Sequence, residues 1–352
     1  MADRKLASAA DEPFPSGRGG CRDLPSRCPN QRKESAINIV ISGAAGFVGV
    51  NLLPRLDTHA DIAARYRRVI LVDPLQYGVQ KIPPTILSDP RYWFVQGSIN
   101  DPAVTEEVIG AGDLVIHLAA EVNSFTAPQA SSSDDPPGYL QRLADKGIGR
   151  LLFLSSADVY GVNDSPDLQE SDPIRPTTVY AAAKAAFEAY LSAFHAMRGL
   201  PFVAFRPVTI YGPNQYPGWL VPRVITQAIT GEQISITGNG SVRRDWIFVS
   251  DVCDLLIKAA LHAGDGIHGE VFNVGTGHEL DVLSLTRRVV DAVGRGESLI
   301  TFVPERAGDI PRQVTRGARA RAAFGWEPLV PLRDGLAQTV AWYQDYHTPQ
   351  PR

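Results

Sequence analysis

The sequence lacks an apolar run long enough to cross a membrane, because glycines interrupt even its most hydrophobic stretch, residues 37–53. It also lacks a basic excess: the net charge is −4, so we expect no nucleic-acid partner and no anionic membrane surface. Cysteine is scarce, and Cys21, Cys28 and Cys253 are too few to indicate a zinc site or a disulfide framework. We therefore expect a cytoplasmic protein that binds no metal.

Residues 1–35 differ in composition from the rest of the chain. They are rich in proline, glycine, arginine and aspartate, and they show no hydrophobic periodicity. They also lack the apolar core of a signal peptide. We expect a disordered extension here.

Apolar strand patterns alternate with helical patterns from residue 37 onward. Strands are expected at 37–42, 68–73, 92–97, 113–120, 150–156 and 202–207. A helix is expected at 178–199, closed by Gly199 with Pro201 just beyond it. The alternation predicts an α/β fold with a Rossmann-type, doubly wound parallel sheet.

The pattern changes after residue 206, where a loop rich in proline and glycine is followed by shorter helices and strands. We expect residues 36–206, with about 246–277, to form a dinucleotide-binding domain. Residues 207–245 and 278–347 should form a smaller carboxyl-terminal substrate-binding lobe. Ligands of such folds bind at the carboxyl edge of the sheet.

Three glycines, Gly43, Gly46 and Gly49, follow the first expected strand in a GxxGxxG spacing and open a helix. Glycine lets the backbone approach a pyrophosphate, and the amino end of the helix offers free N–H groups. Asp73 ends the second strand, where a carboxylate can accept both ribose hydroxyls of NAD and repel the extra phosphate of NADP. The sequence therefore predicts an NAD site.

Tyr180 and Lys184 are spaced i, i+4 and face the same side of the long helix. A nearby ammonium and the positive nicotinamide ring favour the phenolate, so the pKa of Tyr180 should fall. Tyr180 would then take a hydroxyl proton while a hydride leaves the same carbon. Ser156, at the end of the fifth strand, would hydrogen-bond the same substrate oxygen.

These motifs together resemble the extended short-chain dehydrogenase/reductase family. The resemblance rests on GxxGxxG, HLAAE (117–121), SSADVYG (155–161), Tyr180-xxx-Lys184, YGP (211–213) and RRDWIFVSDV (243–252). The chain is most similar to the nucleotide-sugar subgroup typified by dTDP-glucose 4,6-dehydratase. The resemblance implies that NAD oxidises C4 of a dTDP- or UDP-linked sugar and that the hydride later returns.

The resemblance also implies roles for individual residues. Tyr180 is the base, Lys184 tunes it and anchors the nicotinamide ribose, and Ser156 and Asp158 complete the catalytic set. The residues expected at the cofactor are Gly43, Gly46, Phe47, Val48, Gly49, Asp73, Ser98, Ile99, Leu118, Ala119, Ala120, Tyr180, Lys184 and Pro207. The residues expected at the substrate are Glu121, Thr209, Arg244, Asn273 and Arg306.

The chain departs from the subgroup at several of these places. Ala157 replaces the aspartate that donates a proton to the leaving C6 hydroxyl, and Asp158 replaces the glutamate that takes the C5 proton. The segment between His117 and Ser156 is shorter than in the subgroup and contains SSSDDPPG (131–138), which we expect to form a loop. Because this segment normally opens a dimer-forming helix, a homodimer is an open expectation. Ser98 and Thr209 replace an aspartate and an asparagine.

The leading hypothesis is an NAD-dependent nucleotide-sugar epimerase, because an alanine at position 157 cannot serve as the acid for loss of water. The runner-up is a 4,6-dehydratase in which Asp158 abstracts the C5 proton. A decarboxylase of a UDP-glucuronate-like substrate ranks third. A nucleotide-sugar binding protein with little turnover is the alternative outside catalysis.

Overall fold

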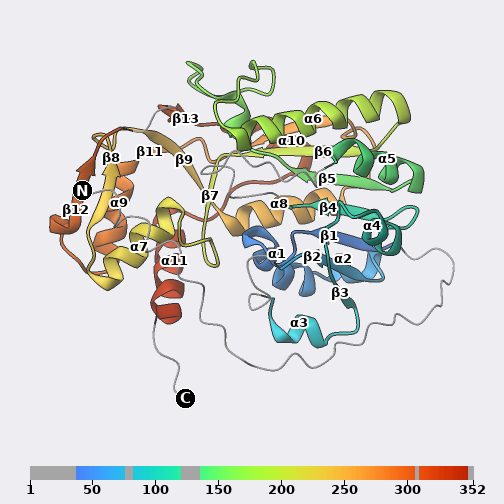
Figure 1. Cartoon of the computed structure of the whole chain (residues 1–352), viewed down its shortest axis with the longest axis horizontal. Helices are drawn as coiled ribbons and strands as arrows, with labels where there is room; N and C mark the ends of the chain where they lie inside the picture. The colour runs from blue at the N-terminus through green and yellow to red at the C-terminus, as the bar shows by residue number, and fades with distance from the viewer. Residues whose placement is uncertain (1–36, 76–81, 120–134, 306–308, 348–352) are drawn as a thin grey trace. The chain divides into compact units, whose positions relative to one another are not determined.

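A seven-stranded parallel sheet forms the centre of the fold, in the order β10-β6-β5-β4-β1-β2-β3 (Figure 1). The computed structural model describes residues 37–75, 82–119, 135–305 and 309–347. The strands are β1 (Ile39–Ser42), β2 (Val69–Asp73), β3 (Tyr92–Gln96), β4 (Leu114–His117), β5 (Arg150–Leu154), β6 (Phe202–Pro207) and β10 (Glu270–Val274). The chain runs outward from β1 to β3 and then returns to β4 on the other side of β1. The predicted doubly wound sheet is confirmed, and its strand order reverses between β1 and β4.

Helices cover both faces of this sheet. They are α1 (Phe47–Asp57), α2 (Ala60–Arg65), α3 (Pro84–Ser88), α4 (Pro102–Val108), α5 (Pro136–Lys146), α6 (Val179–Arg198), α8 (Val249–Leu261) and α10 (Ala318–Phe324). Alternate residues of a strand face opposite sides. Accordingly, Ile39 and Ile41 of β1 pack in one hydrophobic cluster, which includes α1 and α8. Val40 packs in the other, with α5 and α6. Within the described ranges, no helix is long and apolar enough to cross a membrane.

The remaining elements build two smaller sheets around a third hydrophobic cluster. Strand β9 (Arg243–Phe248) pairs with β7 (Thr209–Tyr211), β11 (Glu279–Asp281) and β13 (Arg312–Gln313), and β8 (Ile234–Thr237) pairs with β12 (Ile300–Val303). The helices beside them are α7 (Leu220–Thr230), α9 (Val282–Ala292), α11 (Leu332–His347) and the short 3-10 helix η4 (Glu297–Leu299). Strand β9 spans residues 243–248 and belongs to a smaller sheet. The lobe boundary that we expect at about residue 246 therefore falls inside this strand.

Helix α6 carries Tyr180 and Lys184, and both of its ends are capped. The Thr178 hydroxyl accepts a hydrogen bond from the Ala181 N–H at the amino end. Gly199 ends the helix in the left-handed conformation, with φ +66°. The helix expected at residues 178–199 is confirmed.

The loop expected at residues 131–138 is wrong for its second half, because α5 begins at Pro136. The carboxylate of Asp135 accepts a hydrogen bond from the Gly138 N–H and caps the helix. Proline is tolerated in the first helical turn, where its missing N–H would have no intrahelical partner. Residues 131–134 lie outside the described ranges.

Candidate active site

The glycine-rich turn joins β1 to α1 at the carboxyl edge of the sheet. Gly43 has φ +76°, and a Cβ atom there would lie 2.8 Å from the backbone nitrogen of Ala119. A Cβ atom on Gly49 would lie 2.5 Å from the Ala44 carbonyl oxygen. Gly46 is the N-cap residue of α1 and has no side chain that could occupy the N–H groups at the start of the helix. The turn therefore brings backbone close to backbone and presents the amino end of a helix, as a pyrophosphate site requires.

Asp73 ends β2 beside this turn. One carboxylate oxygen accepts a hydrogen bond from the Ala45 N–H at 3.0 Å, and the other accepts one from the Leu75 N–H at 2.8 Å. Burial raises the pKa of this carboxyl above its usual value, and the two hydrogen bonds oppose that rise. Each carboxylate oxygen has a second lone pair, so the group retains the capacity to accept ribose hydroxyls.

The other cofactor residues expected from the sequence also follow the ends of parallel strands. Ser98 is exposed and Ile99 is buried after β3, while Leu118 and Ala119 follow β4. Pro207 is the last residue of β6, and Phe47 and Val48 begin α1. All of these positions lie at one edge of the sheet, because parallel strands end on the same side. Ala120, Glu121 and Arg306 lie outside the described residues.

Ser156 and Asp158 lie in the turn that follows β5. The Ser156 hydroxyl accepts a hydrogen bond from the Asp158 N–H at 3.1 Å, which begins the 3-10 helix η3 (Ala157–Tyr160). The Asp158 carboxylate accepts a hydrogen bond at 2.9 Å from the side-chain amide of Gln313 on β13. The turn thus places a hydroxyl and a carboxylate next to each other at the sheet edge.

Tyr180 of α6 meets this turn. Its pKa is raised by burial and by the Asp158 carboxylate, while a hydrogen bond with Ser156 opposes the rise. The lowered pKa expected for Tyr180 from the sequence is therefore wrong for the protein without its cofactor, because burial and the Asp158 carboxylate outweigh the hydrogen bond with Ser156. The structure brings Ser156, Asp158 and Tyr180 together, as predicted.

Lys184 lies one helical turn beyond Tyr180 and is 6% exposed. Its ammonium donates to the Leu154 carbonyl oxygen at 2.7 Å and lies 5.9 Å from the centre of the Tyr180 ring. Burial lowers the pKa of Lys184 to about 8, and the Glu188 carboxylate opposes that shift. A charged ammonium near the tyrosine is the arrangement that favours a phenolate.

Arg244 of β9 approaches the same cluster from the smaller sheet. Burial lowers the pKa of its guanidinium, and the carboxylates of Asp158 and Asp309 oppose this shift. Its guanidinium donates to the carbonyl oxygen of Ile310 at 2.5 Å. Thr209 lies on β7, which pairs with β9, and is only partly buried. An arginine that faces the catalytic turn is suited to a diphosphate.

Asn273, also expected at the substrate, lies in the interior. It is 1% exposed, its side-chain oxygen accepts from the Tyr160 hydroxyl, and its amide donates to the Leu168 carbonyl oxygen. Both ends of the amide are therefore engaged within the protein, and the substrate role of Asn273 stays a prediction.

Two residues near the site escape sequence reasoning. Gln313 bonds to Asp158, although 155 residues separate them and no motif surrounds Gln313. Glu188 is recognisable only as the position one turn after Lys184 on the same face of α6. Its carboxylate pairs with Arg206 and accepts a hydrogen bond from Ser155. The four-residue spacing from Lys184 could have identified Glu188 as a residue on the same face of the helix. The sequence around Gln313 contains no pattern that could have identified it.

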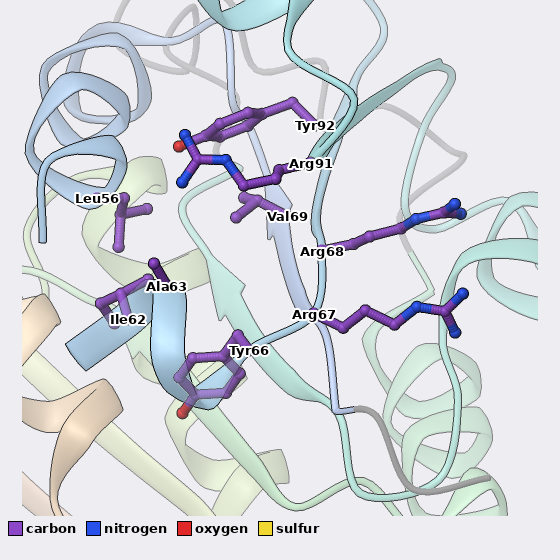
Figure 2. A pocket seen from close by; sticks show the side chains of 9 residues that line it. All are labelled: Leu56, Ile62, Ala63, Tyr66, Arg67, Arg68, Val69, Arg91 and Tyr92. Atoms are coloured by element: carbon purple, nitrogen blue, oxygen red, sulfur yellow. The ribbon is translucent and has the colours of Figure 1, made fainter. Parts of the chain in front are cut away.

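A small cavity elsewhere in the fold is not part of this site (Figure 2). Its volume is about 20 Å³, enough for a water molecule. It is lined by Leu56, Ile62, Ala63, Tyr66, Arg67, Arg68, Val69, Arg91 and Tyr92. Val69 and Tyr92 begin β2 and β3, whereas Asp73 ends β2. The cavity therefore lies at the amino edge of the sheet, opposite to the catalytic residues.

Comparisons with known proteins identify the family of this chain. Residues 39–275 match the family described as the NAD dependent epimerase/dehydratase family. The chain is 34% identical to a dTDP-glucose 4,6-dehydratase of Actinoplanes sp., over 88% of this chain and 98% of that protein. It is 32% identical to a UDP-glucose 4-epimerase of Mycolicibacterium smegmatis, over 87% of this chain and 98% of that protein.

A solved structure is similar in fold. It is DesIV, a dTDP-glucose 4,6-dehydratase from Streptomyces venezuelae with NAD bound, and it superposes with a TM-score of 0.82 at 30% identity. The match covers 88% of this chain and 97% of that chain. The similarity therefore includes the smaller sheets as well as the central one.

Proposed function

The chain belongs to the NAD dependent epimerase/dehydratase family, and we propose that it inverts C4 of a nucleotide-diphosphate sugar. It is an NAD-dependent enzyme of this nucleotide-sugar family. Relatives named for dTDP-glucose and for UDP-glucose support a dTDP- or UDP-linked substrate. Inversion and dehydration share their first step, so the choice between them depends on the residues around the sugar.

The observation that carries the proposal is Ala157. Its side chain is 1% exposed and packs in the hydrophobic core, and Asp158 is the one acidic residue of η3. Loss of water from a sugar needs an acid that protonates the departing hydroxyl. An alanine offers no proton at the place where the resemblance puts that acid. Inversion at C4 needs no such group, because the C4 hydroxyl is oxidised and then reduced again.

The catalytic residues have roles that follow from their contacts. Bound NAD would supply a reversible acceptor for the C4 hydride. The phenolic oxygen of Tyr180 takes the proton of the C4 hydroxyl and later returns it, and the Ser156 hydroxyl holds the same sugar oxygen. The ammonium of Lys184 stabilises the phenolate formed on Tyr180.

The remaining contacts support binding of the substrate and of NAD. The guanidinium of Arg244 would donate to the diphosphate, and Thr209 would lie near it. The glycine turn and Asp73 would hold the pyrophosphate and the adenosine ribose of NAD. Arg306 and Glu121 stay predictions for the sugar nucleotide.

One observation favours a second function, 4,6-dehydration. The Asp158 carboxylate lies close enough to Tyr180 to raise its pKa, so a base is available near the reacting sugar. The 34% identity to a dTDP-glucose 4,6-dehydratase points the same way. In that reaction Asp158 would remove the proton from C5 of the sugar. A proton from the solvent would then replace it at C5.

The two functions differ in product and in isotope pattern. The purified protein is incubated with NAD and UDP-glucose, UDP-galactose or dTDP-glucose in deuterated water, and products are followed by proton NMR. We expect a C4-inverted sugar without deuterium at C5. A 4-keto-6-deoxy sugar that carries deuterium at C5 would instead establish the dehydratase.

A matched pair of variants links the activity to the site. Tyr180→Phe removes only the phenolic oxygen and should reduce kcat by about 10²- to 10⁴-fold. Tyr190→Phe, on the exposed face of the same helix, should retain wild-type kcat. Equal activity of the two variants would show that Tyr180 is not the base.

A further inference from the structure

Gln313 of β13 connects the smaller sheet to the catalytic turn by a hydrogen bond. It is 3% exposed, and its side-chain amide donates to the Asp158 carboxylate at 2.9 Å. This hydrogen bond joins the catalytic turn to β13. On β13 it pairs with Arg244 of β9, so the two residues that approach Asp158 come from neighbouring strands.

The backbone on both sides of Gln313 is held in place. The Arg312 guanidinium donates to the carbonyl oxygens of Ser165 and Pro166, at 2.9 and 2.7 Å. On the other side, the Val314 carbonyl oxygen accepts from the Leu168 N–H at 2.9 Å. These bonds attach residues 312–314 to the loop that follows η3. The amide of Gln313 is therefore presented to Asp158 by a segment with little freedom to move.

Asp158 needs such support because of where it lies. It belongs to a single turn of 3-10 helix, and its backbone N–H is used by the Ser156 hydroxyl. Its side chain is only partly buried, so packing alone does not restrict it to one rotamer. The hydrogen bond to Gln313 occupies one carboxylate oxygen and orients the other. The charge of the Asp158 carboxylate acts to raise the pKa values of both Tyr180 and Arg244, so both residues lie near it.

We propose that Gln313 is a positioning residue, which holds the Asp158 carboxylate in the orientation that the reaction on the sugar requires. This inference rests on the second function proposed above, 4,6-dehydration, because that reaction gives Asp158 a proton to remove and C4 inversion does not. Gln313 itself acts through Asp158 and does not transfer a proton.

A double-mutant cycle tests the inference. Gln313→Met keeps the shape of the side chain and removes its donor. It should lower kcat by about 10- to 100-fold, the effect of one hydrogen bond to a charged group, and change KM by much less. The Gln313→Met/Asp158→Asn double variant should be no slower than Asp158→Asn alone. Losses that add would overturn the inference, because they would mean that Gln313 acts elsewhere.

A compensating exchange distinguishes positioning from mere packing. Gln313→Asn shortens the donor by one methylene and should be as slow as Gln313→Met. Adding Asp158→Glu returns that methylene on the other partner and should restore most of the lost kcat. Failure of this rescue would contradict a positioning role. Gln169→Ala is the control, because Gln169 is exposed and its side-chain amide donates to the Asp167 carbonyl oxygen, not to Asp158.

A readout without turnover separates this inference from the proposed function. Crystal structures of the wild type and of Gln313→Met show the Asp158 carboxylate directly. We expect a single orientation of the Asp158 carboxylate in the wild type. In the variant we expect either a different orientation or two alternative conformers. An unmoved carboxylate would overturn the inference even if the enzyme proved to be a dehydratase. A moved carboxylate would support the positioning of Asp158 by Gln313 even if the enzyme proved to be an epimerase.

Discussion

At the scale of single residues, burial of the Lys184 ammonium lowers the stability of the fold, and the proposed function uses the same ammonium to stabilise the phenolate of Tyr180. Its contacts are the Leu154 carbonyl oxygen and the aromatic rings of Phe153 and Tyr180. These partners are neutral, so they only partly replace the water that burial removes. The residue therefore stays protonated near neutrality but loses its proton more readily than an exposed lysine.

This setting predicts how stability responds to pH. Lys184 titrates at about 8 in the folded protein and near its usual value of 10.5 when unfolded. Between these values the unfolded chain binds more protons, so this residue makes stability rise with pH. Relative to Lys184→Met, the cofactor-free wild type should gain about 2 kcal/mol from about pH 7 to about pH 9.5. Urea unfolding of both proteins measures the difference, and parallel pH profiles would contradict the assignment.

At the scale of elements, the turn between β1 and α1 shows how packing sets the choice of glycine. Gly49 lies in the first turn of α1, where alanine would ordinarily be the better helix former. A Cβ atom there would lie 2.5 Å from the Ala44 carbonyl oxygen and 2.6 Å from that of Gly43. Both neighbours are backbone atoms and cannot move aside without displacing the turn.

Gly49→Ala should therefore lower the melting temperature and weaken NAD binding, against the helix propensity of alanine. The expected cost is about 1–3 kcal/mol, the range for overpacking. Gly266→Ala is the control, because a Cβ atom at Gly266 meets no atom within 4 Å. Calorimetric unfolding and NAD titration give both quantities, and equal behaviour of the two variants would show that the close approach is unimportant.

At the scale of the whole molecule, a buried polar network joins segments that are far apart in the chain. The Glu188 carboxylate of α6 accepts hydrogen bonds from the Arg206 guanidinium of β6 and from the Ser155 hydroxyl. Arg206 also donates to the Tyr160 hydroxyl, which in turn donates to Asn273 of β10. The network lies directly behind the catalytic turn, so it supports Ser156 through its neighbour Ser155.

Glu188→Gln should destabilise the fold by about 3 kcal/mol, because it leaves the buried guanidinium of Arg206 without its counter-charge. The ion pair of the partly buried Arg321 with the exposed Glu327 offers a control, and Glu327→Gln should cost less than about 1 kcal/mol. Denaturant unfolding of both variants measures the two costs. Similar small losses would mean that the network contributes little to stability.

Some whole-molecule expectations stay predictions. These are the homodimer, the cytoplasmic location, the boundaries of the two lobes and the character of residues 1–35, which lie outside the described residues. The structure bears on the first only in that α5 begins at Pro136, within the shortened segment between His117 and Ser156.

Much of the fold could be predicted because its signals are local. Apolar strands alternating with helices indicated the parallel sheet, and Thr178 and Gly199 marked the ends of α6. The spacing of Tyr180 and Lys184 placed both on one helical face, and Ser156 was expected at a strand end. The beginning of α5 was missed because proline and glycine suggested a loop, whereas Asp135 and Pro136 together make a helix start.

By itself, the sequence determined the order of strands and helices, the glycine turn and the presence of Ser156, Asp158, Tyr180 and Lys184. These follow from periodicity, capping and spacing, which act over a few residues. Only the tertiary structure decided that Gln313 bonds to Asp158, that Glu188 pairs with Arg206 and that Asn273 is buried among protein partners. Such contacts depend on how distant segments pack, and burial then shifts the pKa values of Tyr180 and Lys184 by removing water.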